Sequence, residues 1–361
     1  AAPAPASAVL SGTMIKAGLL GWLRFLPLGE AALPQLGGAL FVTGLAGAFL
    51  AVVAGLGQRE AKTVLAYSSI SQMGWLTAAV GAGLLAPAAW PGLLAAVLAY
   101  ALHHGLAKGA LFLSTAVTTP AGAPPATRLV LMIGLVLPAL AIAGLPGTSG
   151  AAAKVGLKEA FAAVPALAGA DPSQLLSLGA AATTLLMVRF LVVLGSGAPG
   201  HGAGPGARGW WAALVAVVAI LPWLVAPLPH WGAKVFSPAL LLPTLGPVAA
   251  AVAVGLGWFL AVRRLRLAMP PPLPAGDIYA LAEAGVRRLA HPTAAWRRRL
   301  SRLWRPGNRL WGFIYHRLWL PGRTRLTAAD RWGWTTSGTA FLLILVLLAL
   351  LLSRSLALGL N

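Results

Sequence analysis

Long apolar runs recur along this chain with only short interruptions, and no other feature restricts the fold as strongly. Only 9% of the 361 residues are charged, whereas a soluble domain averages roughly 25%. A run of about 20 apolar residues can cross the hydrocarbon core of a bilayer as a helix. We therefore expect an all-α polytopic transmembrane bundle of about ten spans. The runs lie near 7–27, 36–56, 62–83, 91–117, 128–145, 149–168, 173–196, 210–229, 243–264 and 335–355.

Positive charge is concentrated before the last of these runs. The net charge is +20, and residues 263–331 contain fifteen arginines against three carboxylates. A basic stretch between two spans is typical of a cytoplasmic loop. We therefore expect a multi-pass protein of a bacterial-type inner membrane, with segment 265–331 in the cytoplasm and no nucleic-acid partner. An amphipathic helix in the headgroup layer that starts near Asp277 and a solvated basic linker both fit this segment.

Cysteine is absent, so the chain can hold no disulfide, iron–sulfur cluster or thiolate metal site. The sequence also contains no recognisable nucleophile–base set, metal-ligand cluster or glycine-rich phosphate loop. We therefore expect no catalytic residues, cofactor or metal in the chain itself. Whether the chain is part of an enzyme complex stays open at this point.

One nine-residue pattern, S-G-x-x-x-K-x-G-L, occurs twice, as SGTMIKAGL at 11–19 and SGAAAKVGL at 149–157. The copies fall in the first and sixth expected spans. We therefore expect them to run in opposite directions, as in the inverted repeats of transporters. The second copy follows GLPG at 144–147, which predicts a helix break that faces protein or water rather than lipid. Chance similarity in a chain rich in alanine and glycine is the alternative.

Lysine is rare in this chain, yet three lysines fall within apolar runs. Six of the 27 basic residues are lysine, and Lys16, Lys108 and Lys154 lie in expected spans. Charge inside a membrane marks function by default, and a buried lysine can release its proton whereas an arginine cannot. His104 lies one turn before Lys108 and can also exchange a proton. We expect these four residues to form a proton relay, while vicinal His103 hydrogen-bonds a neighbouring helix.

Polar residues gather where the third expected span begins. The segment QREAKTVLAYSSISQMGW carries Glu60 and Lys62 at the entrance of the span and Tyr67 and Ser71 within it. We interpret all four as residues that support the relay, although hydrogen bonds between packed helices are the plainer role for the serine. Glu159 follows the second motif and either tunes the local field or lies at the membrane edge.

These segments resemble blocks of a known family. QREAKTVLAYSSISQMG resembles the aspartate/glutamate-x-lysine, AYSSISQ-type signature of proton-conducting antiporter-type subunits. Such subunits occur in respiratory complex I, in membrane-bound hydrogenases and in Mrp-type Na+/H+ antiporters. SGTMIKAGLLGWLRFLP, HGLAKGALFLS and GLPGTSGAAAK are similar to three further blocks in the family's order. The resemblance covers residues 7–160 and corresponds to the C-terminal part of a subunit.

The resemblance implies a fold of two inverted five-helix repeats, each with a lysine on an interrupted helix. It implies that Lys16 and Lys154 are these lysines and that His104 and Lys108 connect them. Family members also carry a glutamate on an earlier helix, and this sequence begins at what would be the seventh helix. We therefore expect that the first half is truncated or supplied by a separate chain, which leaves one complete repeat.

The expected organisation has five parts. They are the end of the first repeat with two helices at 1–60, a second five-helix repeat at 61–200, two further spans at 201–264, the arginine-rich segment at 265–334 and a final span at 335–361.

The resemblance implies a proton-translocating subunit of a multisubunit complex in lipid, with other membrane subunits as partners and H+ or Na+ as the coupled ion. The complex would be an Mrp-type antiporter or the membrane arm of an NADH dehydrogenase or hydrogenase. The alternative is a non-conducting scaffold, or a truncated subunit, that docks partner proteins.

Overall fold

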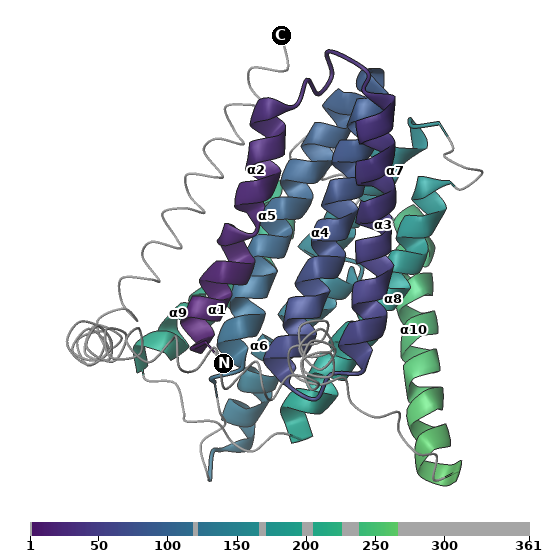
Figure 1. Ribbon diagram of the computed structural model, residues 1–361. Coiled ribbons are helices and arrows are strands. Elements are labelled where there is room, and N and C mark those ends of the chain that lie inside the picture. The colour runs from purple at the N-terminus through teal and green to yellow at the C-terminus, as the bar shows by residue number, and fades with distance from the viewer. Residues whose placement is uncertain (1, 118–121, 166–170, 197–204, 226–237, 266–361) are drawn as a thin grey trace, which may run out of the picture. The chain divides into compact units, whose positions relative to one another are not determined.

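The architecture is a bundle of long helices (Figure 1). The computed structural model describes residues 2–117, 122–165, 171–196, 205–225 and 238–265. Every regular element in these ranges is helical, as the sequence predicts. The helices are α1 Ala4–Val9, α2 Lys16–Phe25, α3 Pro34–Leu56, α4 Ala61–Leu85, α5 Trp90–Ser114, α6 Pro125–Ala143, α7 Ser149–Ala162, α8 Pro172–Ser196, α9 Pro205–Val225 and α10 Pro238–Leu265, with a π-helical turn Leu10–Met14 and a 3₁₀ turn Pro87–Ala89.

The chain divides into two compact units. The first contains residues 1–270 and 337–361, and the second contains residues 271–336. The second unit lies outside the described ranges, and so does the expected final span near 335–355. The fold and the site below therefore belong to the first unit.

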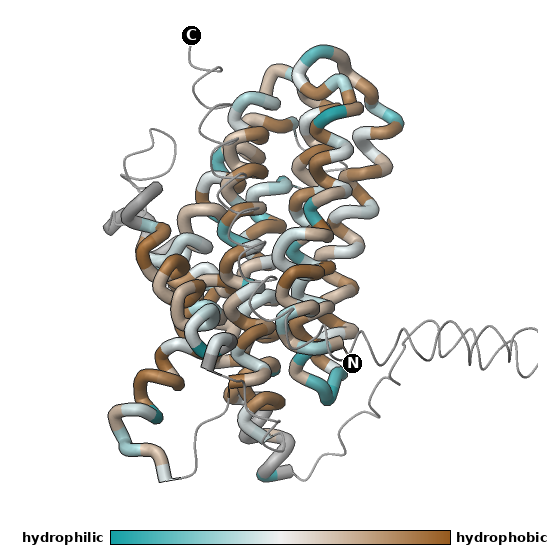
Figure 2. The backbone as a smooth tube through the Cα atoms, turned by 90° about the vertical axis from the view of Figure 1, so that its left-hand side faces the viewer, coloured by the Kyte–Doolittle hydropathy of each residue, from teal (hydrophilic) through white to brown (hydrophobic). Residues whose placement is uncertain are grey.

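Each expected span up to residue 264 coincides with a helix. Five helical stretches in the described ranges are long and apolar enough to cross a membrane, namely Ala4–Phe25, Pro34–Leu56, Pro87–Ser114, Pro125–Ala143 and Pro172–Ser196. Large apolar side chains such as Leu50 and Val53 are exposed along them. Hydrophobic residues follow the helices and hydrophilic ones gather at chain reversals (Figure 2). The chain is therefore a multi-pass membrane protein, because so much exposed apolar surface is stable in lipid and not in water.

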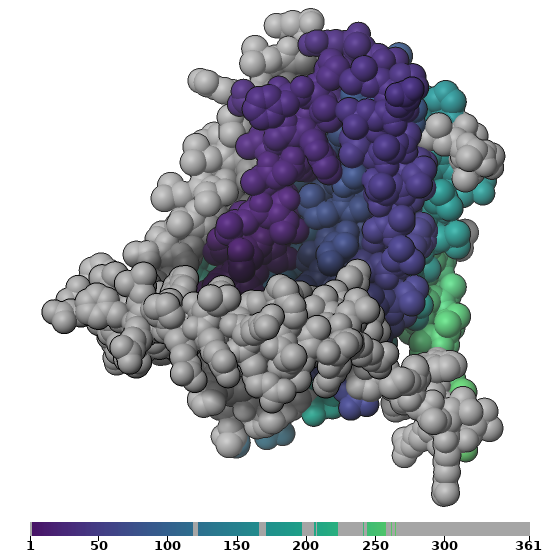
Figure 3. Space-filling model, viewed as in Figure 1, coloured from purple at the N-terminus to yellow at the C-terminus, as the bar shows by residue number. Residues whose placement is uncertain are grey.

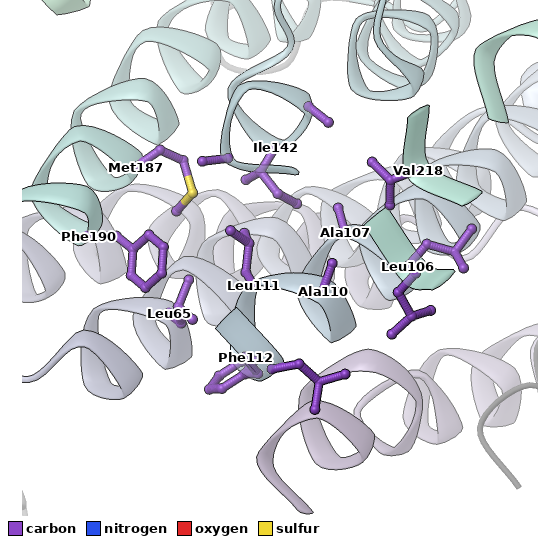
Figure 4. Close-up of a cluster of buried hydrophobic side chains, with 14 of the residues drawn as sticks. Leu65, Leu106, Ala107, Ala110, Leu111, Phe112, Ile142, Met187, Phe190 and Val218 are labelled. Atoms are coloured by element: carbon purple, nitrogen blue, oxygen red, sulfur yellow. The ribbon is translucent and has the colours of Figure 1, made fainter. Parts of the chain in front are cut away.

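Helix α5 is the axis of the bundle. In Pro87–Ser114, 89% of an apolar stretch of 18 residues is buried, whereas 33% of the corresponding stretch of α3 is buried. One core cluster surrounds the C-terminal half of α5 and joins Leu111 to Leu65 of α4, Ile142 of α6 and Phe190 of α8 (Figure 4). A second cluster surrounds the N-terminal half. Most residues of α5 are apolar, as expected of a helix that is buried at the centre of a bundle.

The two clusters also show the direction of the two motif-bearing segments. Ala8 of α1 and Ile142 of α6 belong to the cluster at the C-terminal half of α5. Leu19 of α2 and Leu157 of α7 belong to the cluster at its N-terminal half. Both segments therefore run antiparallel to α5 and parallel to each other. The expected opposite directions are wrong, because α6 and α7 follow one another in the same direction instead of turning back as two spans.

The predicted break between α6 and α7 is confirmed. Helix α6 ends at Ala143, and Gly144 (φ +89°) and Gly147 (φ +77°) take the left-handed conformation that glycine adopts without strain. The hydroxyl of Thr148 then caps α7 by accepting a hydrogen bond from the N–H of Ala151 at 3.3 Å. The break therefore leaves the last carbonyl groups of α6 facing the first turns of α7.

The first motif contains no such break. The π-helical turn Leu10–Met14 joins α1 to α2, and Ala4–Phe25 forms one continuous path. A π-helical turn accommodates an extra residue in the helix and is frequent at functional sites. Both motif lysines therefore follow an irregular turn, but the two turns are built differently.

Helices α3 and α4 touch through glycine. A Cβ atom on Gly74 would lie 2.5 Å from the carbonyl oxygen of Gly44, and one on Gly81 would lie 2.7 Å from that of Gly37. Small residues permit this close approach of two backbones in membrane helices. The contact fixes the position of α4 in the bundle.

Candidate functional site

Three lysines are buried in the bundle, and no carboxylate of the described ranges is buried with them. Lys16 and Lys154 are 8% exposed, and Lys108 is 0% exposed. The other buried polar residues in these ranges are serine, threonine, glutamine and histidine. A buried charge is costly unless an opposite charge or well-placed dipoles stabilise it. Each ammonium group here uses main-chain carbonyl oxygens as its acceptors.

Lys154 lies in α7 and reaches back across the helix break. Its Nζ donates to the carbonyl oxygens of Ile142 at 2.9 Å and Ala143 at 2.8 Å. These carbonyls end α6, where the helix leaves them without intrahelical partners and the helix dipole is negative. Gly144 makes room for the side chain, since a Cβ atom there would lie 2.9 Å from Cδ of Lys154. The break therefore forms a binding site for the lysine ammonium.

Lys108 and Lys16 are held by other carbonyl groups. The Nζ of Lys108 donates to the carbonyl oxygen of Leu65 in α4 at 2.8 Å. The Nζ of Lys16 donates to the carbonyl oxygen of Ser11 in the π-helical turn at 2.9 Å. A Cβ atom on Gly105 of α5 would lie 3.9 Å from Nζ of Lys16. Lys16 therefore contacts α5 within one turn of Lys108.

Two histidines of α5 lie among these lysines. Nδ1 of His103 is 2.8 Å from the hydroxyl oxygen of Ser149, so the predicted hydrogen bond to a neighbouring helix is confirmed. Nε2 of His103 and both ring nitrogens of His104 have no hydrogen-bond partner in the described part of the chain. Between them the two rings interact electrostatically with all three lysines. The two imidazoles therefore lie near all three lysines.

The four residues expected to form the relay lie together, but most of the expected supporting residues do not join them. Glu60 and Glu159 are exposed, and Lys62 and Tyr67 are half-buried. Ser71 is buried, and its hydroxyl donates to a carbonyl oxygen of α3 at 2.7 Å. Ser71 therefore ties two helices together.

Serines at the first position of the two motifs also belong to the site, although the sequence did not identify them. The hydroxyl oxygens of Ser11 and Ser69 are 2.6 Å apart and buried, and Ser149 is the partner of His103. Ser11 and Ser149 occupy the same position in the repeated pattern. The repeat therefore contained the signal, but the partners come from other helices.

A series of buried side-chain hydrogen bonds joins three helices beside the site. The hydroxyl of Tyr100 in α5 donates to Oε1 of Gln72 in α4 at 2.5 Å. Nε2 of Gln72 donates to the hydroxyl of Thr183 in α8 at 3.0 Å. Buried hydrogen bonds of this kind restrict helix positions, so the series holds α5 in place one turn from its histidines.

A groove of about 820 Å³ runs along the first motif. Its walls come from α1, the π-helical turn, α2, α3 and α4, and Figure 3 shows the face on which it opens between α2 and α3. Ser11 and Ser69 line it, together with apolar residues such as Ile15 and Met73. No three histidine, aspartate or glutamate residues of the described ranges are grouped to hold a metal ion.

Comparison with known proteins agrees with this architecture. Residues 1–169 match the family described as "NADH:quinone oxidoreductase/Mrp antiporter, TM". The chain is therefore similar to that family over these residues. Over 121 residues the chain is 36% identical to Hydrogenase-4 component B of Escherichia coli (strain K12). The alignment covers 31% of this chain and 18% of that protein. Over 211 residues it is 35% identical to a Hydrogenase-4 component F homolog of Methylacidiphilum infernorum. This alignment covers 55% of the chain and 43% of that protein.

The chain thus spans less than half the length of these curated relatives. The fold is also that of a solved chain in the Mrp complex from Dietzia sp., with a TM-score of 0.61 and 23% identity. The alignment covers 90% of this chain and 38% of that chain. The resemblance to antiporter-type subunits is therefore confirmed, and with it the all-helical antiporter-subunit fold.

Proposed function

We propose that this chain is a proton-translocating membrane subunit of a multisubunit complex. The observation that carries the proposal is the group of three buried lysines and two buried histidines around α5, with no buried carboxylate in the described ranges. Ionisable groups inside membrane proteins mark ion pathways and proton relays. The family match over residues 1–169 supports the same role.

In this proposal the proton path runs from Lys154 through His104 and Lys108 to Lys16. His103 lies in this path between Lys154 and His104. A neutral imidazole can accept a proton on one nitrogen and release one from the other. An ammonium group has three N–H donors, and these lysines use only one or two of them on carbonyl oxygens. The remaining N–H groups are free to donate to the next group or to water.

Proton translocation is driven either by a redox subunit of the complex or by an opposing Na+ gradient. The relatives named as hydrogenase-4 components support the first, and the fold shared with a chain of the Mrp complex supports the second. We place the subunit in a bacterial-type inner membrane with segment 265–331 in the cytoplasm, as its arginine content favours. Its partners are then other membrane subunits of the same complex.

Replacing Lys154 by alanine should slow proton translocation by at least about tenfold. Lys154 is 8% exposed, so water can replace part of its contribution. The rate is measured as dye-reported acidification of inverted membrane vesicles that contain the complete complex, normalised to the amount of assembled subunit.

Lys158→Ala is the matched control. Lys158 lies one turn later on α7, is half-buried and donates to the hydroxyl of Ser177 at 3.0 Å, so this variant should translocate at the wild-type rate. If Lys154→Ala leaves translocation unchanged, the proposal is wrong and a non-conducting scaffold is the better description.

A further inference from the structure

A hydrogen-bonded pair of serines joins the two carbonyl groups that hold Lys16 and Lys108. The hydroxyl oxygens of Ser11 and Ser69 are 2.6 Å apart. The carbonyl oxygen of Ser11 accepts from Lys16. The hydroxyl of Ser69 donates to the carbonyl oxygen of Leu65 at 3.0 Å, and Lys108 donates to that same oxygen. The two lysines are thereby connected through two side chains from different helices.

The number of hydrogens limits how the pair can be arranged. Each serine hydroxyl has one hydrogen to donate and two lone pairs. When Ser69 donates to Leu65, the hydrogen between the two hydroxyls must come from Ser11. When Ser69 donates to Ser11 instead, the carbonyl oxygen of Leu65 accepts from Lys108 alone, and the O–H of Ser11 can donate to another acceptor. The pair therefore has two orientations.

Lys108 decides between these orientations. Both groups donate to the carbonyl oxygen of Leu65, and a charged donor makes a stronger hydrogen bond than a neutral one, so protonation of Lys108 weakens the bond that Ser69 donates to this oxygen. The hydroxyl of Ser69 then turns toward Ser11, and neighbouring hydrogen bonds adjust together. The carbonyl oxygen of Ser11 accepts the hydrogen bond of Lys16. Reorientation of the Ser69 hydroxyl is therefore transmitted to Lys16 through Ser11.

We propose that Ser11 and Ser69 are positioning residues that couple Lys16 to Lys108 during proton transfer. Their hydroxyl groups only reorient, so no bond to either serine oxygen is made or broken and the pair gains and loses no proton. The inference rests on the proposed function of the chain as a proton-translocating subunit.

The neighbouring residue Ser68 provides a matched control. Ser68 is buried on the same helix at 0% exposure, and its hydroxyl oxygen has no hydrogen-bond partner in the described part of the chain. Removing either hydroxyl deletes one buried oxygen atom from α4. Only the removal at position 69 breaks the link between the lysine sites.

The test compares Ser69→Ala, Ser11→Ala and Ser68→Ala in inverted vesicles that contain the complete complex. Each of the first two should slow translocation by about threefold to tenfold, the rate equivalent of one lost buried hydrogen bond. Ser68→Ala should keep the wild-type rate. Ser69→Thr should restore the rate, because it keeps the hydroxyl and its methyl group can enter the groove that Ser69 lines. The double variant should be no slower than either single variant, because both remove the same link.

A wild-type rate in both Ser69→Ala and Ser11→Ala would overturn the inference. So would multiplied effects in the double variant, because independent effects mean that the two serines do not act as a pair. Loss of translocation in Lys154→Ala beside wild-type rates in the serine variants would reject the serine pair and leave the proton relay in place. Wild-type rates in Lys154→Ala, Ser69→Ala and Ser11→Ala would reject the relay as well.

Discussion

Replacing Lys108 by methionine is expected to stop proton translocation without unfolding the subunit. Lys108 is completely buried at the centre of the relay, so water cannot substitute for it, and a loss of about a hundredfold is expected. Methionine fills a similar volume, and replacing a buried ion by an apolar side chain is often neutral for stability. The carbonyl oxygen of Leu65 keeps the hydroxyl of Ser69 as its donor, so no buried acceptor is left unpaired.

Lys62→Met is the control for this prediction. Lys62 is a half-buried lysine at the start of α4 that donates to the carbonyl oxygen of Ala2 at 2.7 Å. Translocation and thermal stability in detergent are measured for both variants of the complete complex. We expect equal thermal stability for the two, with translocation lost only in Lys108→Met. Wild-type translocation in Lys108→Met would show that the proton path does not pass through Lys108.

Replacing Gly150 by alanine should prevent the subunit from accumulating in folded form. A Cβ atom on Gly150 would clash with the carbonyl oxygen of Ala141 and lie 2.9 Å from Nε2 of His103. Ordinary overpacking costs about 1–3 kcal/mol, and a contact this short with a backbone atom exceeds what side-chain adjustment can relieve. The α6–α7 break would have to open, and the carbonyl groups that hold Lys154 would move.

Gly156→Ala is the matched control, because Gly156 lies on the same helix and a Cβ atom there has no neighbour within 4 Å. The amount of assembled subunit in the membrane and its melting temperature in detergent measure the effect. Gly156→Ala should behave as wild type. Equal stability of the two variants would contradict the close packing of α7 against α6.

The sequence predicted the parts of the site that depend on local chemistry. Lys16, Lys108 and Lys154 were expected to be buried because each lies within an apolar run, and all three are. The break before the second motif was expected because GLPG cannot continue a helix, and both of its glycines have positive φ. In both cases the residues within a few positions determine the outcome.

The parts that depend on tertiary packing were not predicted. The carbonyl oxygens that hold the lysines are backbone atoms, so no residue type marks them. The link from Ser11 to Ser69 crosses 58 positions of sequence. Glu159 is close to Lys154 in sequence and Glu60 directly precedes α4, but both are exposed rather than part of the buried cluster.

The direction of the second motif was predicted wrongly for a different reason. The apolar run near 149–168 was counted as a full span, but α7 has only 14 residues. At 1.5 Å per residue it extends about 21 Å, which is short of the roughly 30 Å hydrocarbon core. Counting apolar residues cannot separate a full span from the second half of an interrupted one.

Proton uptake by proteoliposomes that contain the complete complex tests the central claim most directly. The internal pH is recorded with a trapped dye for wild type and for a variant that combines Lys16→Met, Lys108→Met and Lys154→Met. The account predicts that the variant assembles in normal amounts and that its proteoliposomes take up no protons, whereas wild-type proteoliposomes acidify. Acidification by the triple variant at the wild-type rate would contradict the account.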